Sequence, residues 1–328
     1  MPKAAIIGNT TWGKALAALL GGKGITVKLW TRSEDEAEGL NQEAYCYSST
    51  SYVEEALDEA ELVILAVPSP KMRENVARIK DYLTDSMVLV SAAKGLEAGT
   101  GRRMTQVITE EVAPSRGQQI CVLSGPNLAR EIAHGLPAAS IIAAHDIVIA
   151  ERARGLINSP NFFLVTSDDV VGVELCGALK NVIALGAGMI DGLGLGDNAK
   201  AAFITLGWDE VVSLGLSLGA KVGTFYGLAG LGDLITTCSS TLSRNHQVGY
   251  ELAKGHSLAD ASTLVPQVAE GVNTTLAVHQ LAKTLNLSLP ITNLIYSVLF
   301  EDLPLSRALS QFEKLVENHH QPWVDALR

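Results

Sequence analysis

A single cation stands inside an apolar segment that is crowded with glycine and alanine. Lys180 lies within the run Leu175-Cys-Gly-Ala-Leu-Lys-Asn-Val-Ile-Ala-Leu-Gly-Ala-Gly188. The small residues would let another backbone or a ligand approach a helix closely, in a pocket poor in water. Desolvation there lowers the pKa of a lysine, so its amine could exchange protons near neutral pH. The alternative is a surface lysine whose stem lies along an apolar face.

Two polar groupings in the same half of the chain could act with that lysine. Asp233 follows the glycine-rich stretch Gly227-Leu-Ala-Gly-Leu-Gly232, and Ser243, Arg244 and Asn245 stand together. The hydroxyl, guanidinium and amide of that trio could clamp a phosphate. The plainer alternatives are that Asp233 caps a helix and that Ser243 starts another with Arg244 in solvent.

A glycine-rich turn follows the first apolar strand pattern and opens a helical one. It reads Gly8-Asn-Thr10-Thr-Trp-Gly13. A pyrophosphate can sit on the free N–H groups at the start of such a helix, so the turn predicts dinucleotide binding. Thr10 occupies the middle position of the Gly-x-Gly-x-x-Gly fingerprint, where the backbone should come closest to phosphate. A tight strand-to-helix turn without a ligand is the alternative.

Further polar residues follow other strand patterns. Leu29-Trp-Thr-Arg32 ends the second strand without the acidic residue that would bind a ribose 2′-hydroxyl, and Arg32 could instead pair with a 2′-phosphate or simply be solvated. Lys94 follows a later strand, and Ser124-Gly125-Pro-Asn127 follows the next. Because ligands collect at the carboxyl ends of parallel strands, we expect these loops to face the same crevice as the glycine-rich turn.

The elements that must position these residues alternate in the first half of the chain. Short apolar runs predict buried strands at 4–7, 26–30, 61–67, 87–90, 120–123, 140–143 and 162–165. Helical patterns lie between them, among them 12–22, 53–60, 71–83 and 101–113. This alternation predicts a Rossmann-like, doubly wound parallel sheet with helices on both faces.

After about residue 168 the strand signals stop. Long helical patterns follow at 172–189, 198–218, 243–254, 273–285, 290–300 and 305–317. We therefore predict an α/β domain over 1–168, which contains the glycine-rich turn expected to bind a dinucleotide, and an all-α domain over 169–328. The boundary rests on the change of periodicity alone.

Composition narrows the function classes. The 328 residues are 47% hydrophobic, enough for two cores, and carry a net charge of −10 without a basic run, which argues against nucleic acid. The four cysteines are scattered, so we expect no disulfide framework, no metal site and a cytoplasmic setting. The chain starts directly on a strand pattern, so we expect no signal peptide. Charged residues interrupt the most apolar window, 170–195, which we do not interpret as a membrane span.

Taken together, the motifs resemble those of the bacterial-type NAD(P)-dependent glycerol-3-phosphate dehydrogenases. The matching blocks, in the family's order, are Lys94-Gly-Leu-Glu, Ser124-Gly-Pro-Asn-Leu-Ala-x-Glu, Leu179-Lys-Asn-Val-Ile-Ala-x-Gly-Ala-Gly-Met189, Gly230-Leu-Gly-Asp-Leu234, Ser243-Arg-Asn245 and Val268-Ala-Glu-Gly271. The resemblance covers most of the chain. It implies a Rossmann-like dinucleotide-binding domain followed by an all-α substrate-binding and catalytic domain. It also implies interconversion of sn-glycerol 3-phosphate and dihydroxyacetone phosphate with NAD(P)H, supplying phospholipid synthesis. The small-residue-rich helical half is compatible with a homodimer.

The resemblance also implies roles for single residues. Lys180 would be the acid/base, with Asp233 setting its charge and orientation and Lys94 reaching both substrate and nicotinamide. The substrate positions would be Lys94, Gly125, Asn127, Lys180, Asp233, Ser243, Arg244 and Asn245. The cofactor positions would be Gly8, Thr10, Thr11, Trp12, Gly13, Arg32, Lys94, Ala129, Arg244, Val268 and Glu270.

Two features depart from the family pattern, and two rival interpretations exist. Thr10 replaces the middle glycine, and the segment 33–51 is short and lacks a proline-containing loop. Thr10 could displace the pyrophosphate or weaken the affinity for the dinucleotide, and the choice between NADH and NADPH stays open. A 3-hydroxyacid or 6-phosphogluconate type dehydrogenase would give no reason for the Asp233 and Ser243 motifs. A sensor of NAD(P)H without chemistry would need neither Lys180 nor Asp233.

Overall fold

Alternating side chains on each strand supply two cores, one on either face of a sheet. In the computed structural model, which describes residues 1–43, 46–112, 119–265 and 268–318, Ala4 and Ile6 of the first strand enter one core. Ala5 and Ile7 enter the other. A strand buried on both faces reads as a continuous apolar run, which is why these strands are visible in the sequence.

Packing divides the chain into two units, residues 1–94 with 103–174 and residues 95–102 with 175–328. The sheet of the first unit has the order β3-β2-β1-β4-β5-β6-β7-β8. Its strands are β1 (Lys3–Ile7), β2 (Thr26–Trp30), β3 (Ser48–Thr50), β4 (Leu62–Leu65), β5 (Val88–Ser91), β6 (Ile120–Ser124), β7 (Ala138–Ala144) and β8 (Phe162–Ser167). The predicted Rossmann-like α/β fold is confirmed. The predicted division into one domain over 1–168 and a second over 169–328 stays a prediction.

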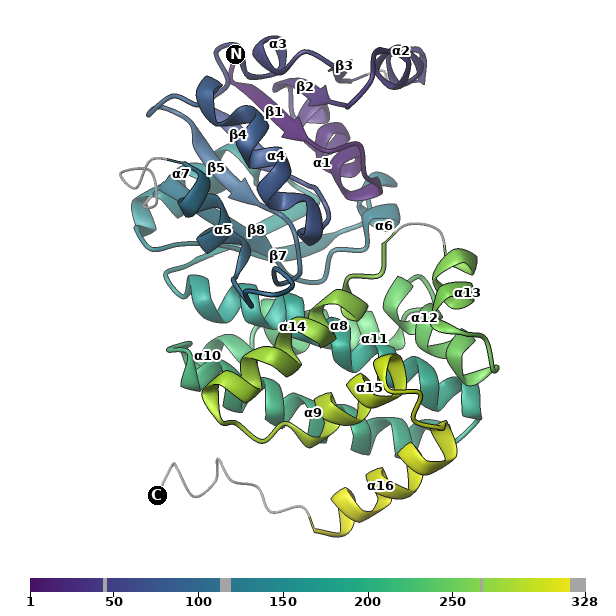
Figure 1. Cartoon of the computed structure of the whole chain (residues 1–328). Helices are drawn as coiled ribbons and strands as arrows, with labels where there is room; N and C mark the ends of the chain where they lie inside the picture. Colours follow the sequence, from purple (N-terminus) through teal and green to yellow (C-terminus); the bar gives the residue numbers. More distant parts are fainter. Residues whose placement is uncertain (44–45, 113–118, 266–267, 319–328) are drawn as a thin grey trace. The chain divides into compact units, whose positions relative to one another are not determined.

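Helices cover both faces of this sheet (Figure 1). One face packs against α1 (Thr11–Gly22), α2 (Glu34–Glu43), α6 (Ala129–Ala133) and α7 (Ile147–Ile157). The other packs against α3 (Val53–Leu57), α4 (Met72–Ile79) and α5 (Met104–Glu111), with the 3₁₀ turns η1 (Ser69–Lys71) and η2 (Lys80–Tyr82) flanking α4. Residue 113, the predicted end of the helix starting at 101, lies outside the described residues.

The sheet differs from the prediction in two respects. The first is β3, whose Ser48-Ser-Thr50 sequence carries no apolar run but pairs in parallel with β2. The second is the direction of β7, which runs antiparallel to β6, while the other pairs are parallel. Residues 125–137 connect the two strands and are long enough for a helical crossover, so the direction of β7 does not follow from the length of this connection.

The second unit is built from helices over its described residues from 175 onward. Its helices are α8 (Val170–Leu193, whose first residues belong to the first unit), α9 (Gly196–Ser217), α10 (Val222–Phe225), the π-helical segment η4 (Leu228–Gly232), α11 (Asp233–Ser239), α12 (Arg244–Ala253), α13 (Leu258–Leu264), α14 (Glu270–Leu285), α15 (Pro290–Phe300) and α16 (Leu305–Glu317). The short helices α10, α11 and α13 escaped the sequence analysis because they hold fewer than three turns.

Helix α8 is the central element of the second unit. Every residue from 172 to 190 is buried. Among the described helices it alone has the length and apolarity of a membrane span, but 94% of its most apolar window is buried inside the chain. A helix that is apolar on all sides is expected in the core of a large domain.

Candidate functional site

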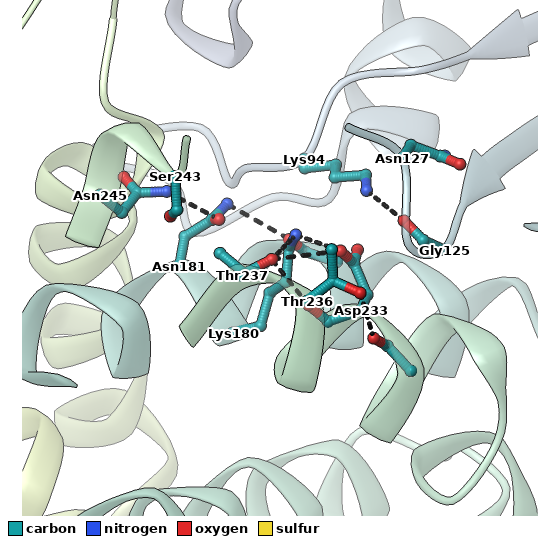
Figure 2. Close-up of polar contacts among 12 residues, drawn as sticks. Lys94, Gly125, Asn127, Lys180, Asn181, Asp233, Thr236, Thr237, Ser243 and Asn245 are labelled. Atoms are coloured by element: carbon teal, nitrogen blue, oxygen red, sulfur yellow. Dashed lines mark hydrogen bonds and ion pairs between the residues drawn. The ribbon is translucent and has the colours of Figure 1, made fainter. Parts of the chain in front are cut away.

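Lys180 is buried and ion-paired in the second unit. It comes from α8, is 5% exposed, and its Nζ donates to Oδ1 of Asp233, which is fully buried at the start of α11 (Figure 2). Nζ also donates to Oγ1 of Thr237 at 2.5 Å. The alternative of a surface lysine is therefore wrong. A buried ammonium with a carboxylate and a hydroxyl at its head is suited to proton transfer.

The hydroxyl of Thr237 has a defined orientation. Its Oγ1 donates to the backbone oxygen of Asp233, one helical turn earlier, at 2.7 Å. A hydroxyl has one proton, and this one is donated to the backbone oxygen of Asp233. The hydroxyl oxygen therefore accepts the hydrogen bond from Lys180. Sequence reasoning missed Thr237. The signal available was its i+4 spacing from Asp233, which places both side chains on one face of a helix.

The glycine-rich stretch before Asp233 permits its placement. Gly230 in η4 has non-helical angles of φ −90° and ψ −105°, and a Cβ there would stand 2.1 Å from the backbone oxygen of Phe225. No side chain fits at that distance, so glycine allows η4 to fold onto the end of α10. Gly232 is the N-cap residue of α11, and Asp233 is its first residue. Asp233 thus serves Lys180, and the alternative of a helix cap is wrong.

Glycines also bring α12 against α8. A Cβ on Gly188 would lie 2.0 Å from the backbone oxygen of His246, and one on Gly249 would lie 1.9 Å from that of Leu185. The close backbone approach predicted for the small residues around Lys180 is confirmed. Because α12 carries the Ser-Arg-Asn motif at its start, this packing fixes the motif beside the helix that holds the lysine.

The motif at the start of α12 divides into different environments. Asn245 is buried, donates from Nδ2 to Oδ1 of Asn181 at 2.8 Å and accepts from the backbone N–H of Gly271 at 2.8 Å. Ser243 caps the helix, its Oγ accepting from the N–H of His246 at 3.4 Å. The alternative of a helix start is therefore confirmed for Ser243. Asn181, which sequence reasoning did not single out, follows Lys180 directly.

Arg244 lies at the surface of the second unit, as the alternative interpretation held. Burial of its surroundings lowers its pKa, and the charge of Glu270 opposes this effect. Glu270 is the first residue of α14, and Val268 lies just before it, 42% exposed. Both predicted cofactor positions are therefore close in sequence to Gly271, which holds Asn245.

In the first unit, the turn after β1 has the form of a dinucleotide-binding turn. Gly8 has φ +123°, and a Cβ on Gly13 would stand 2.2 Å from the Gly8 carbonyl oxygen. Both positions therefore require glycine. Thr10 is the N-cap of α1: its Oγ1 accepts from the N–H of Gly13 at 3.0 Å and donates to the Ala66 oxygen at 2.8 Å. The side chain that replaces the middle glycine thus occupies one of the N–H groups that a pyrophosphate would use.

Several buried polar atoms in the first unit lack a partner among the described residues. Besides Oγ of Ser49 in β3, they are Nε1 of Trp12, Oγ of Ser91, Oγ of Ser124 and Nδ2 of Asn127. Ser91 ends β5 and Ser124 ends β6, both at the carboxyl edge of parallel strands. Orphaned polar atoms are rare in folded proteins, and their position at this edge fits a polar ligand such as NAD(P)H.

Lys94 and the loop after β6 also meet in the first unit. Nζ of Lys94 donates to the backbone oxygen of Gly125 at 2.7 Å (Figure 2). Gly125 has φ +149°, and a Cβ there would lie 2.8 Å from Oγ of Ser140. That same hydroxyl donates to Oδ1 of Asn127 at 2.5 Å. Three predicted site residues are therefore fixed together, with Ser140 as an anchor that the sequence did not reveal.

Of the remaining predicted cofactor positions, Thr11 begins α1 and Ala129 begins α6. Arg32 follows β2, and its Nη2 lies 3.7 Å from Oε1 of Glu74. The residues of each unit thus gather into a cluster of their own, one around the glycine-rich turn and the edge of the sheet, the other around Lys180.

Comparison with known proteins agrees with these clusters. Residues 3–150 match the family model of the NAD-dependent glycerol-3-phosphate dehydrogenase N-terminus, and residues 169–310 match that of its C-terminus. A glycerol-3-phosphate dehydrogenase [NAD(P)+] from Dehalococcoides mccartyi is 50% identical, over 92% of this chain and 88% of that protein. One from Moorella thermoacetica is 41% identical, over 96% of each.

A solved structure has the same fold. The crystal structure of glycerol-3-phosphate dehydrogenase from Coxiella burnetii superposes with a TM-score of 0.89 at 33% identity, covering 95% of this chain and 98% of that one. Both family models and the full-length relatives favour the resemblance drawn from the motifs over the rival dehydrogenase classes. The chain belongs to the family of NAD-dependent glycerol-3-phosphate dehydrogenases.

Proposed function

We propose that the chain interconverts sn-glycerol 3-phosphate and dihydroxyacetone phosphate by hydride transfer with NAD(P)H, with Lys180 as general acid and base. The observation that carries the proposal is the buried ammonium of Lys180 held by Asp233 and Thr237. A sensor that only binds nucleotide has no use for a buried lysine–carboxylate pair, which is expensive to desolvate.

Lys180 handles the proton in both directions of the reaction, donating it in reduction and accepting it in oxidation. NAD(P)H supplies the hydride that reaches C2 of the ketone on reduction. Nζ gives a proton to the C2 oxygen as negative charge develops there, and in oxidation the neutral amine takes the hydroxyl proton back. Asp233 stabilises the ammonium form. The hydroxyl oxygen of Thr237, whose own proton is donated to the Asp233 backbone, orients the amine. Asp233 acts by charge and by orientation, and Thr237 acts by orientation.

The first unit would hold the dinucleotide. We assign the pyrophosphate to the turn from Gly8 to Gly13 and the start of α1, where backbone N–H groups and the helix dipole favour an anion. Lys94 would place a second cation near the reacting end of the cofactor, since the Gly125 carbonyl fixes its position. The orphaned hydroxyls of Ser91 and Ser124 would regain partners on the bound molecule.

The substrate phosphate would be bound by the helical unit. Arg244 supplies a guanidinium at the start of α12, and Asn245 is held rigid by Asn181 and Gly271. A cation at a helix N-terminus is a suitable phosphate partner because the backbone dipole adds to its charge.

The wider assignments follow from this activity. We assign residues 1–168 to the dinucleotide domain and 169–328 to the substrate domain, and we infer that the product supplies phospholipid synthesis. A cytoplasmic location agrees with the four free cysteines. A homodimer is our expectation for the assembled enzyme, to be tested by its mass in solution.

The test is oxidation of NADH and of NADPH by dihydroxyacetone phosphate, followed by the loss of reduced-nicotinamide absorbance. We expect Lys180→Ala to lower kcat by at least 100-fold, while Lys283→Ala, on the exposed surface of α14, leaves it unchanged. Circular dichroism and nucleotide binding establish that both variants are folded. Full activity of Lys180→Ala would overturn the assignment of the acid/base. A folded wild-type protein that binds cofactor but oxidises neither would overturn the proposed reaction.

A further inference from the structure

One carboxylate in the second unit joins three helices. Asp191 lies near the end of α8, and its Oδ2 is 2.7 Å from Nε2 of His246 in α12 and 3.0 Å from Nζ of Lys200 in α9. The three side chains are largely buried, and that of His246 is only 9% exposed. Burial raises the pKa of Asp191, but the hydrogen bonds from His246 and Lys200 more than offset this effect and lower the pKa. The carboxylate is therefore ionised at neutral pH, and Nε2 of His246 donates to it.

His246 directly follows the residues that we assign to the substrate phosphate. It is the third residue of α12, after Arg244 and Asn245. Its backbone oxygen lies so close to α8 that a Cβ on Gly188 would stand 2.0 Å from it. The backbone of His246 thus packs against α8, while its side chain reaches further along the same helix to Asp191.

The two contacts of His246 restrict α12 in different ways. Glycine at position 188 lets the two backbones approach closely, but contact between backbone atoms has little directional preference. A hydrogen bond requires both a short donor–acceptor distance and a nearly linear angle, so the bond from His246 to Asp191 fixes the register of α12 along α8. Lys200 holds the same carboxylate from α9 and so limits the rotation of the acceptor.

The Asp191 carboxylate lies in the same part of the second unit as the proposed acid/base. Burial raises the pKa of the Cys238 thiol to about 12, and the charges of Lys180 and Asp191 both act on that thiol. Cys238 follows Thr237, which accepts a hydrogen bond from Lys180. The register of α12 therefore decides how the phosphate-binding residues lie relative to the lysine.

We propose that Asp191 and His246 are positioning residues, which hold the start of α12 so that Arg244 and Asn245 meet the phosphate of the substrate. The inference rests on the proposed function, because it takes the substrate phosphate to bind at the start of α12. Lys200 supports the pair by fixing the carboxylate that His246 contacts.

The pair acts on binding rather than on proton transfer. Lys180 is held by Asp233 and Thr237, which belong to α11 and not to α12. A chain in which the start of α12 has shifted does not bind the phosphate, so the apparent affinity falls with the fraction of chains that have α12 in place. For the loss of one intramolecular hydrogen bond, we expect an affinity that is lower by about three- to tenfold.

The test uses a complex that cannot react. NADH or NADPH and sn-glycerol 3-phosphate are all in the reduced state, so calorimetric titration of the full chain with this substrate in saturating reduced cofactor measures binding alone. We expect His246→Leu to weaken the binding of sn-glycerol 3-phosphate about three- to tenfold. His246→Gln, whose amide can donate from near the place of Nε2, should restore the affinity to within about twofold of the wild type. The KM for dihydroxyacetone phosphate should rise by the same factor in His246→Leu, while kcat stays within about twofold.

Further variants test whether the two residues act as a unit. Asp191→Ala should weaken the binding at least as much as His246→Leu, and adding His246→Leu to it should cause no further loss, because both changes remove the same interaction. His256→Leu is the matched control. It removes an exposed pair with Glu251 at the other end of α12 and should leave the affinity unchanged.

The outcomes separate this inference from the proposed function. Unchanged affinity in His246→Leu, with only the free energy of unfolding reduced, would overturn the inference, because the pair would then serve stability alone. Affinity that His246→Gln fails to restore, or losses that add in the double variant, would overturn it as well. Binding as expected, without reduction of dihydroxyacetone phosphate, would sustain the inference and refute only the proposed reaction. A wild-type chain that binds the cofactor but not sn-glycerol 3-phosphate would refute both.

Discussion

Glu210 provides a pH-dependent stability test within the helical unit. It is buried on α9 and accepts hydrogen bonds from the N–H groups of Ile291 and Thr292, and from the Thr292 hydroxyl at 2.9 Å. These residues form the first turn of α15, so a carboxylate from another helix caps it. Burial raises the pKa of Glu210 from 4.5 to about 7, although the bonds from Thr292 and Ile291 oppose the effect.

The raised pKa determines the sign of the pH dependence. Between these pKa values the folded chain binds more protons at this position than the unfolded chain, so the free energy of unfolding falls as pH rises. The contribution is fully present below about pH 4.5 and is lost as pH rises through about 7. The difference between these pKa values corresponds to about 3 kcal/mol, most of which falls between pH 5 and pH 8.

The assay is urea unfolding followed by circular dichroism at several values of pH from 5 to 8. Glu210→Gln cannot ionise, so its stability lacks this contribution. We expect the free energy of unfolding of the wild type, minus that of Glu210→Gln, to fall by about 2 to 3 kcal/mol over this range. Glu313→Gln, on the exposed face of α16, should instead show a constant difference from wild type. A constant or rising difference for Glu210→Gln would refute the argument, because the native state would then favour the carboxylate.

Three further predictions concern the site. Asp233→Asn leaves the ammonium of Lys180 buried without a counter-charge. It should reduce the free energy of unfolding by about 3 to 5 kcal/mol and kcat by at least 100-fold. Near-wild-type values in urea unfolding and in turnover would contradict this. Thr10→Gly frees an N–H group at the start of α1, so it should lower the KM for cofactor with turnover largely intact and stability reduced by a few tenths of a kcal/mol; an unchanged or higher KM would count against it. Gly249→Ala would force a Cβ against a carbonyl of α8 and should lower the free energy of unfolding by about 1 to 3 kcal/mol. Gly223→Ala, with open space around it, serves as the control. Equal melting temperatures of the two variants would disprove the close packing.

Much of the fold could be read from local patterns. Strands buried on both faces must be apolar without interruption, so β1, β4, β5 and β6 stand out in the sequence. A cation within an apolar, small-residue helix needs a partner, so Lys180 could be singled out without coordinates. The glycine-rich turn was recognisable for a similar reason, since the backbone conformation at Gly8 excludes most side chains. In each case a physical constraint acts on neighbouring residues.

The tertiary structure alone decided which residues meet. Nothing local shows that Asp233 pairs with Lys180, 53 residues earlier, or that Thr237 completes the group. The antiparallel direction of β7 is visible only in its pairing with β6, and β3 forms because β2 offers an unpaired edge to a polar segment. The contact of Arg32 with Glu74 joins elements on either side of β1. Residue types and local periodicity determine which segments must be buried. Contacts between distant segments are fixed only when the whole chain packs, because the same charged and hydrogen-bonding groups could find partners in many different arrangements.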